Sequence, residues 1–454
     1  MPKKKTALTI EERLQQALVP AEEQPYEVPE NWVWVRLGEV NKYVSKSVNP
    51  ISEPDKIFEL YSVPSMADDY PEIIAGSDIG SSKQSVCKED VLLCKINPRI
   101  NRVWKVSQFT DNELIASSEW IIIRNNHINA NYLMYCFQSK YFREFMLSNV
   151  SGVGGSLMRA QPKYVQTYPI PLPPLSEQQR IVESIEELFA KLDEAKERLQ
   201  EVADSFAVRK AAILHNAFTG ELTKQWRREN GVSDESWEEK KLGEVGFWLG
   251  GGTPSTSREE YWENGNILWI TSKDMKSAVI EDTLMKVNEI GVKNSSANYI
   301  EKPALLVVMR SGILRRTFPV AMVKKPFTVN QDLKAIIPDK DDLEFLYWML
   351  LSNEQRILDT CMKNGTTVES INSNALKDLT FKCPTLPEQH EIVRLIDDLL
   401  ARERAAQQVA EQALASIDLM KKSILARAFR GELGTNKASE ASALELLKQV
   451  LAEN

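Results

Sequence analysis

Residues 175–222 and 386–433 are two copies of one sequence pattern, and they align without a gap. Both copies begin with Leu-x-Glu-Gln and end with Phe-x-Gly-Glu-Leu. Ungapped self-similarity of this length is typical of a tandem repeat whose copies share one structure. The alternative, two unrelated amphipathic helices in two separate domains, does not explain why both copies share the same beginning and the same end.

Apolar residues recur in both copies at alternating spacings of four and three, which indicates long helices that each bury one narrow stripe. In the first copy the stripe consists of Ile181, Ile185, Leu188, Leu192, Ala195, Leu199, Val202, Phe206 and Ile213, with Arg209 as its one polar member. In the second copy it consists of Ile392, Ile396, Leu399, Ala406, Ala410, Ala413, Ile417, Met420 and Ile424. We expect the two helices to bury these stripes against each other.

The ends of the first helix carry their own signals. Ser176 and Gln179 are spaced as a capping box, and Gly220 stands where a C-terminal cap belongs. The sequence therefore predicts one continuous helix of roughly 40 residues, about 60 Å long at about 1.5 Å per residue.

The repeat extends to the whole half-chain, because residues 31–40 and 236–245 share the pattern Trp-x4-Leu-Gly-Glu-Val. Strand-like apolar runs and one helical segment follow each opening, so the fold class is α/β (α+β), with two unlike globular bodies alternating with the two helices around a pseudo-two-fold axis. A Gly/Ser/Thr loop follows each body helix, at residues 151–156 and 364–370. The predicted divisions are 1–30 (helical appendage), 31–174 (first body), 175–222 (first helix), 223–235 (linker), 236–385 (second body), 386–433 (second helix) and 434–454 (tail with a short helix).

Composition narrows the class of protein. The chain of 454 residues has five cysteines without a Cys-x-x-Cys pair and three scattered histidines, which favours reduced thiols and no metal site. No apolar run approaches the roughly 18 residues of a membrane span, and the N-terminus lacks the apolar core of a secretory signal. We expect a cytoplasmic protein without a membrane contact.

The net charge of −8 hides two basic islands, one in each body. The first consists of Lys83, Lys88, Lys95, Arg99, Arg102 and Lys105. The second consists of Lys302, Arg310, Arg315, Arg316, Lys324, Lys325 and Lys334. Basic islands in two separate domains fit a polyanion that is bound at two places, although each island by itself is as readily an ordinary solvated surface.

Motifs of catalysis are missing from the sequence. It contains no P-loop, no Gly-x-Ser-x-Gly and no Asn/Asp/Ser-Pro-Pro-Tyr/Phe tetrapeptide of the kind that holds a flipped base. The glycine-rich segments Gly-Val-Gly-Gly-Ser and Trp-Leu-Gly-Gly-Gly are better interpreted as turns. We therefore assign no catalytic residue.

The paired Pro-Leu-Pro-Pro-Leu-Ser-Glu-Gln and Pro-Thr-Leu-Pro-Glu-Gln entries, together with the Phe-x-Gly-Glu-Leu exits, closely resemble the specificity subunit of type I restriction–modification systems. The resemblance covers residues 31–433, and residues 251–275 are similar to the opening of many bodies in that family. It implies that each body is a target recognition domain that reads one half of a bipartite DNA sequence, and that the two long helices pair as an antiparallel coiled coil. It also implies partners: two methyltransferase subunits, which hold S-adenosylmethionine, and restriction/translocase subunits. No cofactor is expected in this chain.

Side chains with forked donors and acceptors are the ones that read base edges, and lysines beside them more often hold phosphate. In the first body the candidates are Lys83, Lys95, Arg99, Asn101, Arg102 and Lys105. In the second body they are Thr253, Ser255, Lys273, Arg310, Arg315, Arg316, Asn330 and Gln331. Unlike bodies predict an asymmetric DNA target, and the helix length predicts the length of its unread spacer.

Two other functions remain open at this point. A stand-alone regulator that binds a split DNA site would need no partner subunits. A structural coiled-coil adaptor with protein-binding end domains would need no DNA. Only the scaffold for DNA reading explains why the plan is doubled, why the bodies differ and why catalytic motifs are missing.

Overall fold

The computed structural model describes residues 8–152, 158–363 and 368–452. The chain forms two compact units. Unit 1 runs to Leu199 and resumes at Gln412, and unit 2 spans Gln200–Glu411. Each unit therefore holds one body, the first part of one long helix and the last part of the other, so the units cut across the divisions predicted from the sequence.

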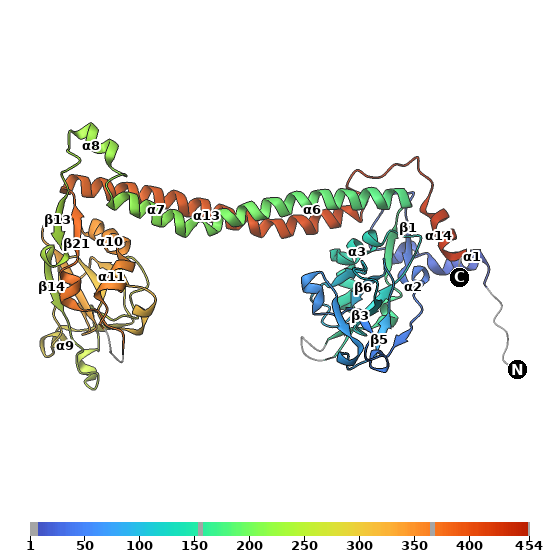
Figure 1. Cartoon of the computed structure of the whole chain (residues 1–454), viewed down its shortest axis with the longest axis horizontal. Helices are drawn as coiled ribbons and strands as arrows, with labels where there is room; N and C mark the ends of the chain where they lie inside the picture. The colour runs from blue at the N-terminus through green and yellow to red at the C-terminus, as the bar shows by residue number, and fades with distance from the viewer. Residues whose placement is uncertain (1–7, 153–157, 364–367, 453–454) are drawn as a thin grey trace. The chain divides into compact units, whose positions relative to one another are not determined.

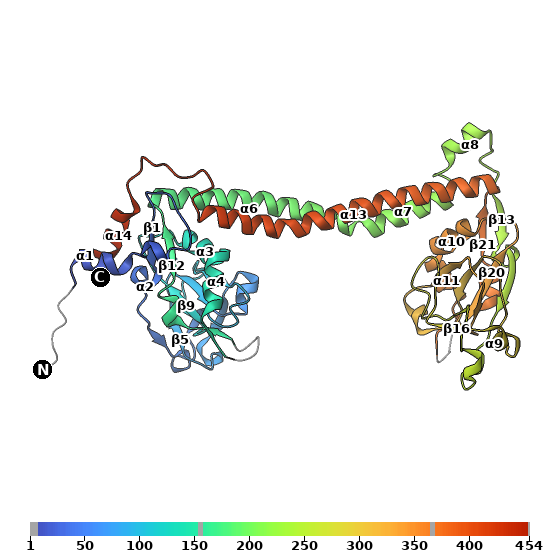
Figure 2. The same cartoon turned by 180° about the vertical axis from the view of Figure 1, so that it is seen from behind.

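The body of unit 1 contains two main sheets, with strand orders β2-β5-β8-β3-β4 and β7-β6-β9, and the two-stranded pairs β1-β12 and β10-β11. Helix α3 lies beside the second of these main sheets, and α4 packs against α3 (Figures 1 and 2). The strands are β1 (Val33–Arg36), β2 (Ser47–Val48), β3 (Ile57–Tyr61), β4 (Glu72–Ala75), β5 (Lys83–Ser85), β6 (Val91–Cys94), β7 (Val103–Lys105), β8 (Glu113–Ala116), β9 (Trp120–Ile123), β10 (Val150–Ser151), β11 (Arg159–Ala160) and β12 (Pro169–Leu172). The helices are α1 (Ile10–Ala17), α2 (Leu37–Val40), α3 (Ala130–Gln138), α4 (Lys140–Ser148), α5 (Pro162–Val165) and α14 (Ala443–Ala452).

The body of unit 2 likewise contains two main sheets, with strand orders β14-β20-β17-β18 and β16-β15-β19. Its strands are β13 (Glu238–Lys241), β14 (Gly246–Gly250), β15 (Ile267–Ile270), β16 (Met285–Val287), β17 (Ala304–Val308), β18 (Val320–Val323), β19 (Phe327–Val329), β20 (Leu333–Pro338) and β21 (Thr380–Cys383). Its helices outside the repeat are α8 (Lys224–Asn230), α9 (Glu289–Lys293), α10 (Leu343–Ser352), α11 (Glu354–Cys361) and α12 (Ser373–Lys377).

The two bodies share one topology in spite of their unlike sequences. Strand β6 lies between β7 and β9 as β17 lies between β18 and β20, and all four pairings are antiparallel. Strand β3 is parallel to β8 and antiparallel to β4, as β15 is to β19 and β16. The equivalence extends to single bridges, since Ile96 pairs with Arg159 and Arg310 pairs with Ser370. The bodies are therefore two versions of one fold.

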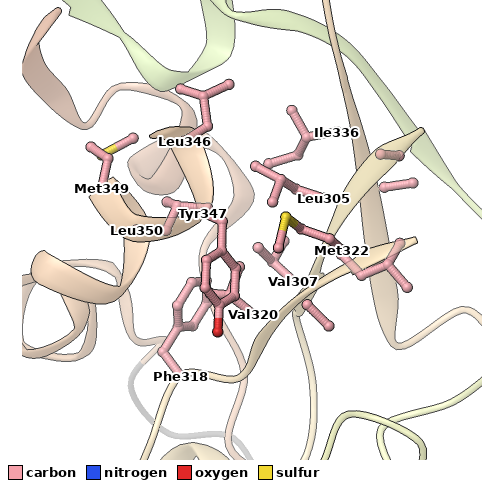
Figure 3. Packing of buried hydrophobic residues seen from close by; sticks show 14 of the residues in the cluster. Leu305, Val307, Phe318, Val320, Met322, Ile336, Leu346, Tyr347, Met349 and Leu350 are labelled. Carbon is pink, nitrogen blue, oxygen red and sulfur yellow. The ribbon is translucent and has the colours of Figure 1, made fainter. Parts of the chain in front are cut away.

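The core of unit 2 lies between its four-stranded sheet and α10. Figure 3 shows Leu346, Tyr347 and Leu350 of α10 beside the sheet residues Leu305 and Val307. Strands β17 and β18 are buried throughout, because helices or loops cover both faces of the sheet. Such strands lack polar alternation, and their sequences are continuous apolar runs. In unit 1, Tyr132 and Phe137 of α3 pack in the same way against β6 and β7.

The long helices pair antiparallel within each unit. The first copy forms α6 (Leu175–Asp204) and α7 (Phe206–Phe218), and the second forms α13 (Leu386–Ala428). In unit 1 the Nζ atom of Lys421 pairs with Asp193 and lies 5.0 Å from the ring centre of Phe189. In unit 2, Arg209 pairs with Glu403. The antiparallel pairing expected of the two helices is therefore present within each unit.

Two features of the first copy differ from the prediction. The helix begins at Leu175, because the carbonyl of Pro174 already accepts the backbone N–H of Gln178, so Ser176 lies inside the first turn and is no capping residue. The predicted single helix is also interrupted at Ser205, whose hydroxyl donates to the carbonyl of Val202. Ser205 and that carbonyl both accept hydrogen bonds from Arg209, the polar member of the stripe, and such local bonds compete with helix continuation. Gly220 follows the cap residue with a φ of 84°, as the prediction requires.

Burial along the stripe only partly follows the predicted spacing. The buried members are Ile181, Ile185, Ile392, Ile396, Ala410 and Ile417, and the half-buried members are Leu192, Ala195, Leu199, Phe206, Ile213, Leu399, Ala413 and Ile424. Leu188, Val202, Ala406 and Met420 are exposed, so their assignment to the stripe is wrong. Leu214, Leu400 and Leu425 are buried instead. A straight helix has 3.6 residues per turn and drifts against a 3.5-residue repeat, which moves the buried stripe to neighbouring positions.

The two ends of the described chain pack together on unit 1. Thr9 and Glu12 form a capping box at the start of α1. Helix α1 lies beside α14 (Figures 1 and 2), and the guanidinium of Arg13 donates to the carbonyl of Leu451 at 3.1 Å. The helices of the appendage and of the tail therefore share one small apolar layer. None of the described helices is long and apolar enough to cross a membrane.

Candidate nucleic-acid interface

Each body is joined to its long helix by the glutamine of the Leu-x-Glu-Gln motif. In unit 1 the side-chain oxygen of Gln178 accepts the backbone N–H of Asn129, the residue before α3, at 2.9 Å. In unit 2 the side-chain oxygen of Gln389 accepts the backbone N–H of Asp342, the residue before α10, at 2.7 Å. Both amides also donate to a proline carbonyl at 3.0 Å. We call this side of each body its junction end.

The opposite side of unit 2, which we call its loop end, collects the loops that follow four strands. Strand β20 runs from Leu333 to the junction end, so the residues paired with its beginning mark the loop end. Gly250 pairs with Lys334, and Val308 pairs with Leu333, which places the last residues of β14 and β17 there. The ends of β15 and β19 lie there too, because Asn330 follows β19 and its backbone N–H donates to the carbonyl of Ile270 at 3.0 Å.

Most of the residues predicted to bind DNA in the second body meet at this loop end. They are Thr253, Ser255, Lys273, Arg310, Arg315, Arg316 and Gln331, which come from four different loops. The Thr253 hydroxyl donates to the side-chain oxygen of Gln331 at 2.8 Å, and Arg315 pairs with Glu369. The Ser255 and Ser257 hydroxyls share a hydrogen bond of 2.8 Å.

Asn330 differs from these residues because it is buried. Its side chain donates to Asp332 and accepts that residue's backbone N–H, each at 3.2 Å. These bonds hold the turn between β19 and β20, and we leave Asn330 out of the interface.

The loop end of unit 1 is formed in the same way. Strand β9 runs from Trp120, opposite Cys94, to Ile123 near the junction end, so the loop between β6 and β7 lies at the loop end. That loop carries Lys95, Arg99, Asn101 and Arg102. One amide hydrogen of Asn101 is already used, because it donates to the carbonyl of Gln138 at 2.9 Å. Lys83 also lies at this end, because the next residue, Gln84, pairs with Ala116 at the end of β8 and its side-chain amide donates to the carbonyl of Trp120 at 3.0 Å.

Lys105 lies at the junction end of unit 1, which separates it from the other candidates. It pairs with Val91 at the beginning of β6, and its ammonium lies 3.5 Å from Glu89. Lys324 and Lys325 are likewise at the junction end of unit 2, in ion pairs with Glu344 and Glu281. A hairpin reverses the chain, so basic residues that are close in sequence lie at opposite ends of its strands. The basic islands are therefore divided in space.

Arg159 belongs to the loop end of unit 1, although no sequence pattern selects it. Its guanidinium contacts the carboxylate of Glu119 through two hydrogen bonds of 3.2 and 3.3 Å. The backbone N–H of the next residue, Ala160, donates to the carbonyl of Lys95 at 2.8 Å. Arg159 is more than 50 residues from the island it joins, and only the strand pairing reveals the proximity.

The described side chains at the two loop ends have groups suited to binding a polyanion. Across residues 8–152, 158–363 and 368–452, no group of three or more His, Cys, Asp or Glu side chains could hold a metal ion. Burial raises the pKa of the Cys136 and Cys383 thiols to about 12, so both are protonated at neutral pH. What gathers at the two loop ends is guanidinium, amide and hydroxyl groups, which are the groups that bind phosphates and base edges.

Comparison with known proteins identifies the class. The family model of the type I restriction modification DNA specificity domain matches the chain twice, over residues 29–204 and 234–412. The chain belongs to this family of DNA specificity domains, as its repeated motifs predict.

Particular relatives agree with the family. The chain is 37% identical over 196 residues to the EcoR124I/EcoR124II type I restriction enzyme specificity subunit of Escherichia coli, a match that covers 41% of this chain and 48% of the relative. The match thus spans about half the length of that relative. The StySPI specificity subunit of Salmonella potsdam is 26% identical over 348 residues, which covers 72% of each chain.

A crystal structure of the HsdS subunit from Thermoanaerobacter tengcongensis has the same fold. Its TM-score to this chain is 0.67 at 21% sequence identity, over 90% of this chain and 100% of that one. The prediction of two bodies that alternate with two long helices is confirmed.

Proposed function

We propose that this chain is the DNA-reading specificity subunit of a type I restriction–modification complex. The observation that carries the proposal is the pair of equivalent loop ends, each lined by basic and amide side chains, in two domains of a DNA specificity family. Because the residues at the two loop ends differ, the two halves of the DNA target differ as well. The chain itself supplies no catalytic residue in this proposal.

Arginine at the loop ends reads guanine or holds phosphate, and asparagine or glutamine reads adenine. The proposed readers in unit 1 are Lys83, Lys95, Arg99, Asn101 and Arg102. The proposed readers in unit 2 are Thr253, Ser255, Lys273, Arg310, Arg315, Arg316 and Gln331. We further propose that the length of the connecting helices fixes the length of the unread DNA between the half-sites.

The proposed partners are two methyltransferase subunits, which bind S-adenosylmethionine, and restriction/translocase subunits. The long helices expose several large apolar side chains, and such side chains support a protein partner along these helices where they lie together. These side chains are Leu188, Val202, Val208, Val409, Leu419 and Met420. The complex would act in the cytoplasm, where chromosomal DNA is accessible.

A methylation map of the source strain, with and without this chain, tests the proposal. We expect one asymmetric bipartite N6-methyladenine motif to disappear on deletion and to return with the wild-type gene. A regulator that binds a split site would leave the map unchanged while the isolated chain still binds DNA specifically. An adaptor would leave the map unchanged and bind no DNA, and either result would overturn the proposal.

A further inference from the structure

Two hairpin loops occupy equivalent places in the two bodies. The first joins β6 to β7 and spans residues 95–102, and the second joins β17 to β18 and spans residues 309–319. A backbone bridge holds each loop in place. In unit 1 the bridge joins Ile96 to Arg159, which precedes β12, and in unit 2 it joins Arg310 to Ser370, which precedes β21. The loops have little sequence in common, so any shared chemistry reflects their position.

Each loop exposes one isoleucine among arginines. Ile100 is 47% exposed and stands between Arg99 and Arg102. Ile313 is 39% exposed, whereas its neighbour Leu314 is 2% exposed and anchors the loop in the core. Arginine side chains at both loops would bring this apolar group against a polyanion.

Hydrogen bonds hold both loops in fixed conformations. In the first loop the backbone N–H of Ile100 donates to the carbonyl of Asn97 at 3.0 Å, and the N–H of Asn97 donates to the carbonyl of Met158 at 2.7 Å.

In the second loop the N–H of Ser311 donates to the carbonyl of Glu369 at 3.0 Å, and the N–H of Ile371 donates to the carbonyl of Met309 at 2.8 Å. Each isoleucine therefore lies on a turn that hydrogen bonds already hold in place. Less conformational entropy is then lost when a ligand contacts it.

We propose that Ile100 and Ile313 each contact the C5-methyl group of a thymine in the major groove of the half-site that their unit reads. The inference rests on the proposed function and adds to it the residues that recognise thymine. The major groove of DNA admits a two-stranded β-ribbon such as these hairpins. The C5-methyl of thymine is the apolar group that the base edges expose there. Arginines beside each isoleucine supply the contacts to guanine or phosphate that position the hairpin.

The test uses the tagged full chain, purified from its source strain with the subunits that accompany it, and duplexes that carry the methylated motif. Each thymine of the motif is replaced in turn by deoxyuridine, which lacks only the methyl group. We expect one replacement in each half-site to weaken wild-type binding about fourfold, as the loss of one buried methyl group does. In the Ile100→Ala variant the replacement in one half-site should have no further effect, and Ile313→Ala should abolish the effect in the other.

Matched variants separate this contact from general damage. Ile57→Ala and Phe247→Ala remove exposed apolar side chains near the strand ends that are remote from the loop ends, and both should keep the full sensitivity to deoxyuridine. Ile100→Val retains most of the apolar contact and should bind nearly as the wild type does.

Four results would overturn the inference: a half-site without thymine, a wild-type complex that is insensitive to deoxyuridine, alanine variants that keep the sensitivity, or controls that lose it. A wild-type chain that selects no motif would instead overturn the proposed function.

Discussion

The Nη1 atom of Arg227 lies 2.8 Å from the Oε1 atom of Glu388, and the two side chains are 7% and 0% exposed. Glu388 is the acid of the second Leu-x-Glu-Gln motif, and the Thr223 hydroxyl donates to the same oxygen at 2.7 Å. The equivalent acid in unit 1, Glu177, has neutral donors instead, and the indole N–H of Trp32 reaches it at 2.8 Å. The acid that the two motifs share therefore binds a different segment in each unit. Glu388 binds the segment that holds Thr223 and Arg227, and Glu177 binds the segment that holds Trp32.

Arg227→Met should destabilise the chain by about 3–5 kcal/mol, because it leaves the buried carboxylate of Glu388 without its cation. The measurement is the urea dependence of unfolding for the full chain. Arg228→Ala changes an exposed neighbour and should have an effect within about 0.5 kcal/mol. Adding Glu388→Gln to the Arg227→Met variant removes the buried charge and should recover part of the loss. If the double variant is no more stable than Arg227→Met, the buried charge is not the cause.

The glutamines of the two motifs should each stabilise the contact between a body and its long helix. Gln178→Leu or Gln389→Leu leaves a partly buried backbone N–H and a buried carbonyl without their partners, which costs up to about 1–3 kcal/mol for each unpaired group. Urea unfolding measures the loss, and limited proteolysis locates it. Gln179→Leu alters the exposed neighbour and is the control. Equal midpoints for Gln178→Leu and Gln179→Leu would show that these bonds contribute nothing.

The long helices and the doubled plan follow from the sequence because periodicity and self-similarity are properties of the chain itself. What the periodicity misses is which of two neighbouring residues is buried. Leu400 is buried beside a half-buried Leu399, since helix drift and contact with the body shift the stripe. Periodicity also does not reveal the interruption at Ser205, because that interruption depends on where the guanidinium of Arg209 finds acceptors.

The candidate site could be predicted only as far as residue type and approximate region. Arg102 and Lys105 are three positions apart in the sequence, yet they stand at opposite ends of β7. Asn330 has the right side chain for base contact, but the turn that it stabilises uses its polar groups. Arg159 joins the site through strand pairing across more than 50 residues. Such outcomes depend on register and burial, which residue types alone do not determine.

Glu59 should make the stability of unit 1 depend on acid. Burial raises the pKa of this carboxyl, but it accepts the backbone N–H groups of Phe109 and Thr110 and the hydroxyls of Thr110 and Tyr61 at 2.7–2.9 Å. These bonds outweigh burial, so the pKa lies below its ordinary value of about 4.3.

Because the folded-state pKa is depressed, the carboxylate stabilises the fold fully above that ordinary value. This stabilisation is lost as the pH falls through the folded-state pKa. Glu59→Gln should therefore be less stable than the wild type near pH 7, and the difference should shrink below about pH 4. Urea unfolding between pH 3 and pH 7 measures it, with the exposed Glu22→Gln as the control. A difference that stays constant over this range would contradict the prediction.

Arg102 and Lys105 offer the sharpest comparison for DNA binding, because both are basic and only one lies at the loop end. Arg102→Ala should weaken specific binding by about 1–3 kcal/mol if the guanidinium reads a base, or reduce the salt dependence by about one ion if it holds a phosphate. Lys105→Ala should change neither quantity, since its ammonium is 3.5 Å from Glu89 at the junction end. Titration of the tagged full chain against its methylated motif at several salt concentrations measures both. A larger effect from Lys105→Ala than from Arg102→Ala would mean that DNA contacts the junction end, and the loop-end interface would be wrong.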